Sequence, residues 1–457
     1  MGESAVFSVI LCDNSTWRFV MELISTRDAS RIVSFHQAVL DCIPPDGGLY
    51  VPAQEEDLRR WIMFMDDSTS FSSIAGTLTS ALLKEEFSPV VCERIAGKAF
   101  AGRSPEIRQL DDHVFSLELH TGPTGCHKDF GFLWFASALE HLLIMDTTTA
   151  TVMAAVDEIT GRSLAAAVAG KERLRLVLVY PKEHVRGLNP ETFVSNGGNI
   201  WPVEIDGNLS AAEDLVRAVY SDRSLVEKFN LTLANTMNIG RLLPQVFFYM
   251  YAFTRIRKKI MGDLFYAVPA GNYGNLVAGL YGWKFSLPVN GFITNTTSGL
   301  SCDARGNCLF MDSLVPLKER GPADPAAPSN LERLEQVFEL NPRMLRGLVY
   351  PMDVSRNLVP DLMLDVYRKY GIFVDSDTAL AWGAITAAGD RIDYDEASVV
   401  LVSKDHPAFE AGTIKRACGQ PVKVPDFMED FSRPVPGITT IPADVEQLKK
   451  VLVEMGS

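Results

Sequence analysis

The sequence has few features of three common protein classes: disulfide-rich, membrane-spanning and nucleic-acid-binding proteins. Its seven cysteines are odd in number, and none forms a Cys-x-x-Cys pair, which argues against a disulfide framework and a tetrahedral zinc site. No apolar run is long enough to span a membrane, and residues 1–20 lack the pattern of a secretory leader. We therefore expect a protein of a reducing compartment, the cytoplasm, with no membrane association.

An excess of basic residues is also absent. Lys and Arg number 43 against 57 Asp and Glu, which gives a net charge of -14. Such a charge repels the phosphates of nucleic acids and anionic lipids, so no nucleic acid partner is expected. If the substrate is an anion, its site needs a local positive potential from helix N-termini, lysine or arginine.

The composition is that of an ordinary globular protein. The chain has 457 residues, of which 47% are apolar and 22% charged, and this length exceeds what one hydrophobic core usually organises. There is no internal repeat and no low-complexity tract. At least two packed units are therefore expected.

Short apolar runs alternate with helical stretches along most of the chain, and this pattern predicts an α/β fold with parallel sheets. Residues 30–98 are mostly helical, with a short extended piece at 49–52, and 299–330 has the composition of a long loop. Strands are expected at 114–119, 148–156, 174–180, 200–205, 264–268, 289–293 and 398–403. Ligands of such sheets bind at the carboxyl ends of the strands.

The first candidate site is the stretch LELHTGPTGCHKDFG, residues 117–131, where Lys128 stands at the start of a predicted helix. A cation there opposes the positive end of the helix dipole, so its amine should lose a proton more easily. A neutral amine is the nucleophile that Schiff-base chemistry requires. The alternative is a surface lysine compensated by Asp129, and this explains an isolated lysine better because most lysines are solvated.

The second candidate site is the stretch LFYAVPAGNYGNLVAGL, residues 264–280. A predicted strand leads into a turn with Gly271 and Gly274, and a helix follows, so the amides of residues 271–275 can converge on an anion. The turn lacks the lysine and hydroxyl of a nucleotide-binding P-loop and is too short for a dinucleotide-binding motif. A nucleophilic lysine and a metal-free cradle for one phosphate together match pyridoxal 5'-phosphate, which carries one aldehyde and one phosphate.

Several motifs, in one order along nearly the whole chain, resemble the threonine synthase family. They are STR at Ser25, PDGGLYVP from Pro45, GPTGCHKDFG from Gly122, GGNIWPVEIDG from Gly197, NTMNIGRLLPQ from Asn235, VPAGNYGN from Val268 and PSNLER from Pro328. The resemblance implies a fold type II pyridoxal-phosphate enzyme, similar to the tryptophan synthase β subunit. It would have a helical N-terminal region (1–112), a smaller α/β domain with the Schiff-base lysine (113–240) and a larger α/β domain with the phosphate loop (241–457).

The resemblance also implies an activity. Members of the family are carbon–oxygen lyases of threonine biosynthesis that convert O-phosphohomoserine into threonine and phosphate by elimination and water addition. This chain would act on that small phosphorylated amino acid, or a related one, as a monomer or a homodimer. We keep two alternatives: a phospholyase giving 2-oxobutyrate, ammonia and phosphate, and a catalytically impaired pyridoxal-phosphate-binding regulatory protein.

Individual site residues follow from the resemblance, position by position. Lys128 would form the internal aldimine and then act as general base at the substrate's α and β carbons. The cofactor phosphate would be held by Gly271, Asn272, Tyr273, Gly274 and Asn275. We place Asn235, Asn238 and Arg241 near the substrate anion, and the guanidinium fork of Arg241 suits a phosphate.

The sequence departs from the family where a Ser-Gly-Asp-Thr-Gly loop receives the substrate's α-carboxylate. Here residues 157–161 read DEITG, so that only Thr160 and Gly161 match. Asp157 and Glu158 would each repel a carboxylate by about 1 kcal/mol even when well solvated. Either the acids point away and backbone amides still bind the carboxylate, or the substrate presents another group there, or turnover has been lost.

Further departures lie near the predicted cofactor ring. The family has a hydroxyl residue as the partner of the pyridine nitrogen, where this chain has Lys404, and Ser403 stands one residue earlier. Either side chain could take that role. Asp405 replaces the following alanine, and Asp377 stands where the family usually has a histidine. Changes in all these places suggest an altered specificity.

Overall fold

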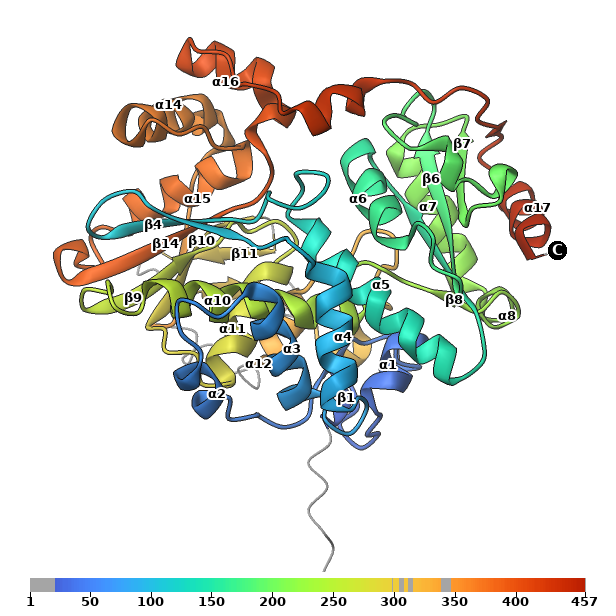
Figure 1. The fold of residues 1–457 in the computed structure, drawn as a ribbon, viewed down its shortest axis with the longest axis horizontal. Coiled ribbons are helices and arrows are strands. Elements are labelled where there is room, and N and C mark those ends of the chain that lie inside the picture. Colours follow the sequence, from blue (N-terminus) through green and yellow to red (C-terminus); the bar gives the residue numbers. More distant parts are fainter. Residues whose placement is uncertain (1–20, 298, 304–307, 311–314, 338–346, 457) are drawn as a thin grey trace, which may run out of the picture.

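The computed structural model describes residues 21–297, 299–303, 308–310, 315–337 and 347–456. Within these residues, two sheets with helices on their faces make up most of the fold (Figure 1), which confirms the predicted α/β class. Residues 1–20, where no leader is expected, and parts of the segment 299–330 lie outside the described residues. No helix in the described part is both long and apolar enough to span a membrane.

The N-terminal region is mainly helical, as predicted. Its two short strands pair antiparallel, and Ser34 and Ser70 cap the helices that follow them by accepting hydrogen bonds from backbone amides. The elements are β1 (Leu23–Ser25), α1 (Phe35–Asp41), β2 (Tyr50–Pro52), α2 (Arg59–Phe64), α3 (Phe71–Leu82) and α4 (Pro89–Phe100).

The smaller sheet is parallel throughout, with the strand order β15-β7-β6-β5-β8. Its strands are β5 (Ala150–Ala155), β6 (Leu174–Pro181), β7 (Ile200–Ile205), β8 (Leu231–Thr232) and β15 (Thr440–Ile441). Leu176 and Leu178 of β6 join one hydrophobic cluster, whereas Val177 and Val179 join another on the opposite face. Burial of both faces explains why β6 is a continuous apolar run.

Helices α5 to α8 and α17 accompany the smaller sheet. They are α5 (Lys128–Met145), α6 (Glu158–Val168), α7 (Leu209–Ser221), α8 (Arg223–Lys228) and α17 (Val445–Gly456). Residues of α7 and α17 share the hydrophobic cluster that contains Val177 and Val179. Leu164 and Val168 of α6 belong to the cluster on the other face.

The larger sheet has the strand order β13-β10-β9-β14-β4-β3, in which only the β3–β4 pairing is antiparallel among the pairs described. Its strands are β3 (Glu106–Gln109), β4 (Val114–Glu118), β9 (Asp263–Ala267), β10 (Gly291–Asn295), β13 (Val349–Met352) and β14 (Ala397–Ser403). The helices are α9 (Ile239–Leu242), α10 (Val246–Ile256), α11 (Gly274–Lys284), α12 (Leu331–Val337), α14 (Val359–Tyr370), α15 (Ser376–Ala387) and α16 (Ala411–Cys418).

The chain passes between the two sheets more than once. Strand β4 pairs with β14 in the larger sheet, and the chain then enters α5 and the smaller sheet. After α16 it crosses back, so that β15 pairs with β7 and α17 packs near α7 (Figure 1). The predicted domain boundaries at residues 112 and 240 stay a prediction.

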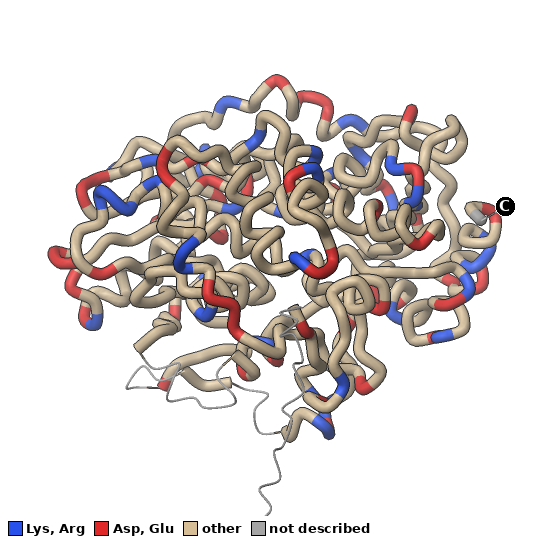
Figure 2. Tube along the Cα trace, turned by 60° about the horizontal axis from the view of Figure 1, so that its bottom comes forward, with Lys and Arg blue, Asp and Glu red and all other residues tan. Residues whose placement is uncertain are grey.

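The segment predicted as a long loop contains regular structure. Strands β11 (Leu300–Cys302) and β12 (Cys308–Phe310) pair antiparallel, so the prediction of an irregular loop over 299–330 was wrong in this part. Both strands are only three residues long, which is too short for a period-2 pattern to be recognised. Acidic and basic residues are interspersed over the described part of the chain (Figure 2).

Candidate active site

A cavity of about 440 Å³ lies where several strands end. Its walls include the end of β5, the turn after β9 and the residue that follows β14. These are carboxyl ends of parallel strands, the expected position of a ligand site. Among the predicted site residues, those lining the cavity are Lys128, Thr160, Asn235, Arg241, Gly271, Asn272, Asn275 and Lys404.

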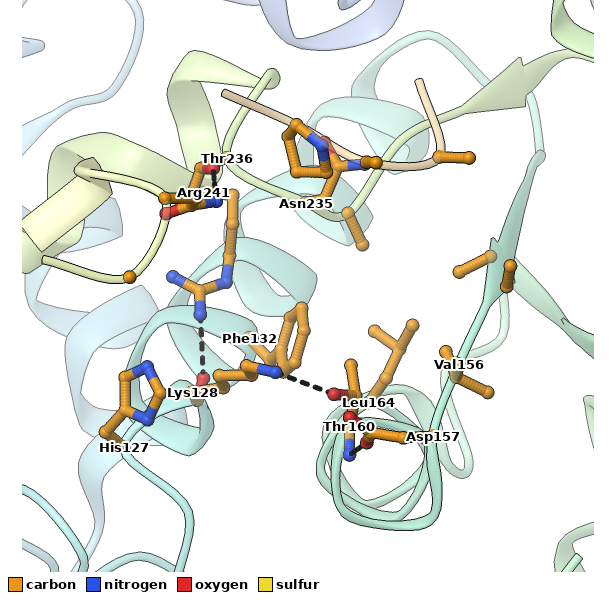
Figure 3. Close-up of a pocket in the computed structure, with 18 of the residues that line it drawn as sticks. His127, Lys128, Phe132, Val156, Asp157, Thr160, Leu164, Asn235, Thr236 and Arg241 are labelled. Carbon is orange, nitrogen blue, oxygen red and sulfur yellow. Dashed lines mark hydrogen bonds between the residues drawn. The ribbon is translucent and has the colours of Figure 1, made fainter. Parts of the chain in front are cut away.

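Lys128 is the first residue of α5, and its amine points across the cavity to α6 (Figure 3). The Lys128 Nζ donates a hydrogen bond of 2.7 Å to the Thr160 Oγ1. The Asp129 carboxylate is buried and accepts hydrogen bonds from Thr124 and Ser163 instead. The alternative of a surface lysine compensated by Asp129 is therefore not what the structure shows.

The glycine turn after β9 leads directly into the N-terminus of α11. Gly271 (φ +48°) and Tyr273 (φ +62°) have left-handed backbone, and α11 begins at Gly274. Tyr273 and Gly274 are not among the residues that line the cavity. The Tyr273 ring is buried, and its hydroxyl forms a hydrogen bond with the Thr297 hydroxyl. An N-terminus with a left-handed turn in front of it offers backbone amides to an anion.

Arg241 of α9 contributes a buried cation to the cavity wall. Its guanidinium carbon lies 4.4 Å from the centre of the Phe132 ring, and its Nη2 donates to the Lys128 carbonyl oxygen at 3.3 Å. Its Nε has no hydrogen-bond partner among the described residues. Burial lowers the pKa of Arg241 to about 10, so the side chain remains charged near neutral pH. A buried cation with an open donor favours an anionic ligand.

The absence of a side chain at Gly131 makes room for this guanidinium. A Cβ atom at position 131 would lie 2.0 Å from the Arg241 Nη1, which is far inside van der Waals contact. A glycine is therefore required in the KDFG motif at position 131, because any side chain there would clash with the Arg241 guanidinium.

The substrate loop, residues 235–241, is only partly turned towards the cavity. The Asn235 Nδ2 donates to the Pro325 carbonyl oxygen at 2.7 Å, and Thr236 lies beside it in the cavity wall. Asn238 is fully buried elsewhere: its amide donates to the Val39 and Leu233 carbonyl oxygens, and it caps α9. The structure thus brings Asn235 and Arg241 into the cavity but not Asn238.

Thr236 was missed by sequence reasoning. Its hydroxyl accepts hydrogen bonds of 2.9 Å from the Asn272 Nδ2 and the Asn330 Nδ2, so it connects the substrate loop to the glycine turn. Its position within the NTMN motif, between Asn235 and Asn238, could have identified it as a site residue.

Comparisons with known proteins give a consistent result. The family model described as the threonine synthase N terminus matches residues 22–100. Threonine synthases of Serratia marcescens and Escherichia coli K12 are each 28% identical to this chain, and each alignment covers 95% of it and 99% of the relative. The crystal structure of threonine synthase from Escherichia coli superposes with a TM-score of 0.76 at 25% identity, covering 95% of this chain and 100% of that one. The chain is similar to threonine synthases over nearly its whole length.

Another solved structure agrees on the fold. The crystal structure described as PLP-bound threonine synthase from Brucella melitensis has a TM-score of 0.80 at 21% identity and covers 95% of this chain and 99% of that one. The threonine synthase fold is therefore retained despite the departures noted in the sequence.

The two acids of the divergent loop, Asp157 and Glu158, have different positions in this threonine synthase-like chain. Asp157 caps α6 and stays in the cavity wall, where its Oδ1 accepts a hydrogen bond of 2.6 Å from the Thr160 backbone amide. The Glu158 carboxylate pairs with His184 at 3.2 Å and Arg186 at 3.5 Å and does not line the cavity. Of the two acids, it is Asp157 that stands in the cavity wall.

Two other departures from the threonine synthase pattern form a single ion pair. The Lys404 Nζ lies 2.6 Å from the Asp377 Oδ2 and lines the cavity. Burial acts to lower the pKa of Lys404, but the charges of Asp377 and Asp405 outweigh it and raise that pKa. Ser403 is buried at the end of β14 and does not line the cavity. Of the two candidates for the ring partner, Lys404 is the one that faces the cavity.

A second polar pair lies directly before Lys128. The His127 Nδ1 and the Asp405 Oδ1 are 2.7 Å apart, and the His127 backbone amide donates to the same carboxylate oxygen at 3.0 Å. Burial lowers the pKa of His127 to about 4 although Asp405 acts in the opposite direction, so the ring is neutral near pH 7. This pair ties the segment after β14 to the start of α5.

Proposed function

We propose that this protein is a pyridoxal-phosphate-dependent enzyme that converts O-phosphohomoserine, or a related phosphorylated amino acid, into threonine and inorganic phosphate. The observation that carries the proposal is that Lys128 and the glycine turn line the same cavity. Its relatives and the fold support the same activity.

The residues of the cavity fit pyridoxal phosphate. The turn at residues 271–275 has left-handed backbone at Gly271 and Tyr273 and precedes a helix, which suits one phosphate without a metal. The Lys128 amine faces the cavity without an ion-pair partner at its Nζ among the described residues and is suited to bind an aldehyde. A volume of about 440 Å³ is within the ordinary range of small-molecule sites.

The cofactor, when bound, supplies the electron sink that stabilises negative charge on the substrate's carbon atoms. Lys128 would hold its aldehyde, and the amides of residues 271–275, with Asn272 and Asn275, would hold its phosphate. Lys404, which follows β14 and pairs with Asp377 of α15, would face the cofactor.

The protein's own residues divide the remaining work. Once released, the Lys128 amine is the base that moves protons at the α and β carbons, and the Thr160 hydroxyl fixes where that amine rests. Arg241 and Asn235 would bind the phosphate that leaves from the γ carbon. Phe132 packs under the guanidinium and keeps water from one of its faces.

Product analysis tests this function. Purified protein with pyridoxal phosphate should release threonine and inorganic phosphate in equal amounts from O-phosphohomoserine. K128A should lose both phosphate release and the visible absorption band of the bound cofactor, whereas K182A, which removes an exposed lysine paired with Asp206, should keep them. A wild-type protein that shows no such band with added cofactor would contradict the proposal.

The products also separate the alternatives. Formation of 2-oxobutyrate and ammonia in place of threonine would indicate a phospholyase, and cofactor binding without phosphate release would indicate a regulatory protein. We further propose that the enzyme works in the cytoplasm as a monomer or homodimer. The six described cysteines are free thiols, which is compatible with a reducing compartment.

A further inference from the structure

Arg333 is a completely buried cation, and the side-chain hydrogen bonds that it makes within the described residues go to neutral groups. Its Nε donates to the Tyr50 carbonyl oxygen at 3.0 Å and its Nη2 to the Met237 carbonyl oxygen at 2.6 Å. Its Nη1 donates to the Thr236 carbonyl oxygen and, at 2.8 Å, to the Asn330 Oδ1. Burial lowers the pKa of Arg333 to about 10, so it is charged near neutral pH. Burying a charge is costly unless its hydrogen bonds are satisfied, and here two of the four acceptors, the Thr236 and Met237 carbonyl oxygens, belong to the substrate loop.

Asn330, which directly precedes α12, extends these contacts to the glycine turn. Its backbone amide donates to the Asn272 carbonyl oxygen at 3.1 Å, and its side-chain Nδ2 donates to the same oxygen at 3.2 Å. The same Nδ2 donates to the Thr236 Oγ1 at 2.9 Å. We name Asn330 and Arg333 the α12 clamp. Together they connect two walls of the cavity, the substrate loop and the glycine turn.

The clamp acts from behind the cavity wall. Neither Asn330 nor Arg333 lines the cavity, whereas Thr236 and Asn272, which they hold, both do. The Thr236 carbonyl oxygen accepts a hydrogen bond from Arg333, and the Thr236 hydroxyl accepts from Asn272 and Asn330. Thr236 and its neighbour Asn235 both line the cavity. The labelled Thr236 and Asn235 lie next to each other in Figure 3.

We propose that Asn330 and Arg333 are positioning residues, which fix the distance between the glycine turn that receives the cofactor phosphate and the substrate loop that receives the substrate phosphate. This inference rests on the proposed function. Misplacement of a binding group by about 1 Å can reduce a rate about a hundredfold, so a clamp at this place would set how well both phosphates are bound together.

The test compares R333M and N330A with a matched control, R27M. The side chain of Arg27 is only 5% exposed and pairs at 2.9 Å with Glu332, the residue before Arg333. Its other side-chain hydrogen bonds go to the carbonyl oxygens of Asp46, Arg320 and Gly321, which do not line the cavity. R27M therefore loosens the same helix without touching the substrate loop. For each folded variant, titration of the apo-protein gives the affinity for pyridoxal phosphate, and steady-state kinetics give KM and kcat for O-phosphohomoserine.

The two clamp variants should differ in a way that a general loss of stability would not produce. R333M should raise KM by about tenfold or more but change the cofactor dissociation constant less than about threefold, because Arg333 contacts the substrate loop directly and reaches the glycine turn only through Asn330. N330A should raise both constants, because Asn330 holds both walls. R27M should keep both within about twofold of wild type.

The proposal is overturned if R333M or N330A has the wild-type KM, or if R27M loses as much as R333M does, since α12 would then be only a brace of the fold. Should R333M fail to fold, N330A and R27M still decide the question. Should the wild-type protein not turn over O-phosphohomoserine, the dissociation constant of inorganic phosphate for the cofactor-loaded protein takes the place of KM. Equal phosphate affinity in wild type and N330A, or no phosphate binding in the wild type, would then refute the clamp.

Discussion

Replacing Asp157 by serine removes a carboxylate from the cavity wall and keeps a good cap for α6. The Asp157 Oδ1 accepts a hydrogen bond of 2.6 Å from the Thr160 backbone amide, at the positive end of that helix. If a substrate α-carboxylate binds these amides, as the family resemblance implies, Asp157 competes with it and repels it. Two unit charges 4 Å apart interact by about 1 kcal/mol in water and about 4 kcal/mol at an effective dielectric constant of 20.

Asp157 is exposed, so the lower figure applies. About 1 kcal/mol corresponds to roughly a fivefold change in an equilibrium constant. D157S should therefore lower KM for O-phosphohomoserine about fivefold and leave kcat nearly unchanged, because the Asp157 carboxylate does not contact the Lys128 amine. Since serine is as good a cap as aspartate, the urea midpoint should stay the same.

Steady-state phosphate release measures both constants, and E158Q is the control. Glu158 has the same charge one residue away, but it pairs with His184 and Arg186 outside the cavity, so E158Q should have the wild-type KM. An unchanged KM in D157S would show that the substrate carboxylate does not bind at the N-terminus of α6. An equal fall of KM in both variants would show that the general negative charge matters and the capping contact does not.

Three further predictions concern residues in the cavity wall and their neighbours. G131A should raise KM at least about tenfold and keep the cofactor absorption band, because the new methyl displaces the Arg241 guanidinium; a wild-type KM would contradict this. K404M and D377N should each weaken cofactor binding, with less than additive losses in the double variant, and additive losses in cofactor titrations would argue against a shared ion pair. The pKa of His127 is about 4 in the folded protein and near 6.5 in the unfolded chain, so the unfolded chain binds more protons between these values and the free energy of unfolding falls as the pH drops through them. H127Q lacks this titration and should therefore lose less stability than wild type between pH 7 and 5. Urea titrations at the two pH values measure this, and an equal loss in both proteins would contradict it.

Much of the fold could be predicted because its strands are apolar on both faces. The run at 174–180 lies between two hydrophobic clusters, and the run at 398–403 becomes β14 in the middle of the larger sheet, so periodicity and length identify them. Sheet membership could not be predicted in this way. The pairing of β4 with β14 joins residues almost 300 positions apart, and no local pattern records it.

The site was predictable as a set of segments, but the direction of individual side chains was not. Lys128 and the glycine turn were found from their motifs, and the structure places them in one cavity. Asn238 lies in a segment predicted to be near the substrate, but it is the N-cap of α9 and its side chain bonds backbone groups there. Asp157 is likewise the N-cap of α6, whereas Glu158 lies inside the helix and pairs with His184 and Arg186. Arg333 was part of the PSNLER motif, and its role became visible only through its contacts.

The return of the chain to the smaller sheet has a consequence for biosynthesis on the ribosome. Strand β15, which completes one border of that sheet beside β7, is made only after every strand of the larger sheet. Until residues 440–441 leave the exit tunnel, β7 presents an open edge to other chains. The smaller sheet therefore reaches its final form only after the larger sheet has been synthesised, although most of its own strands are made earlier.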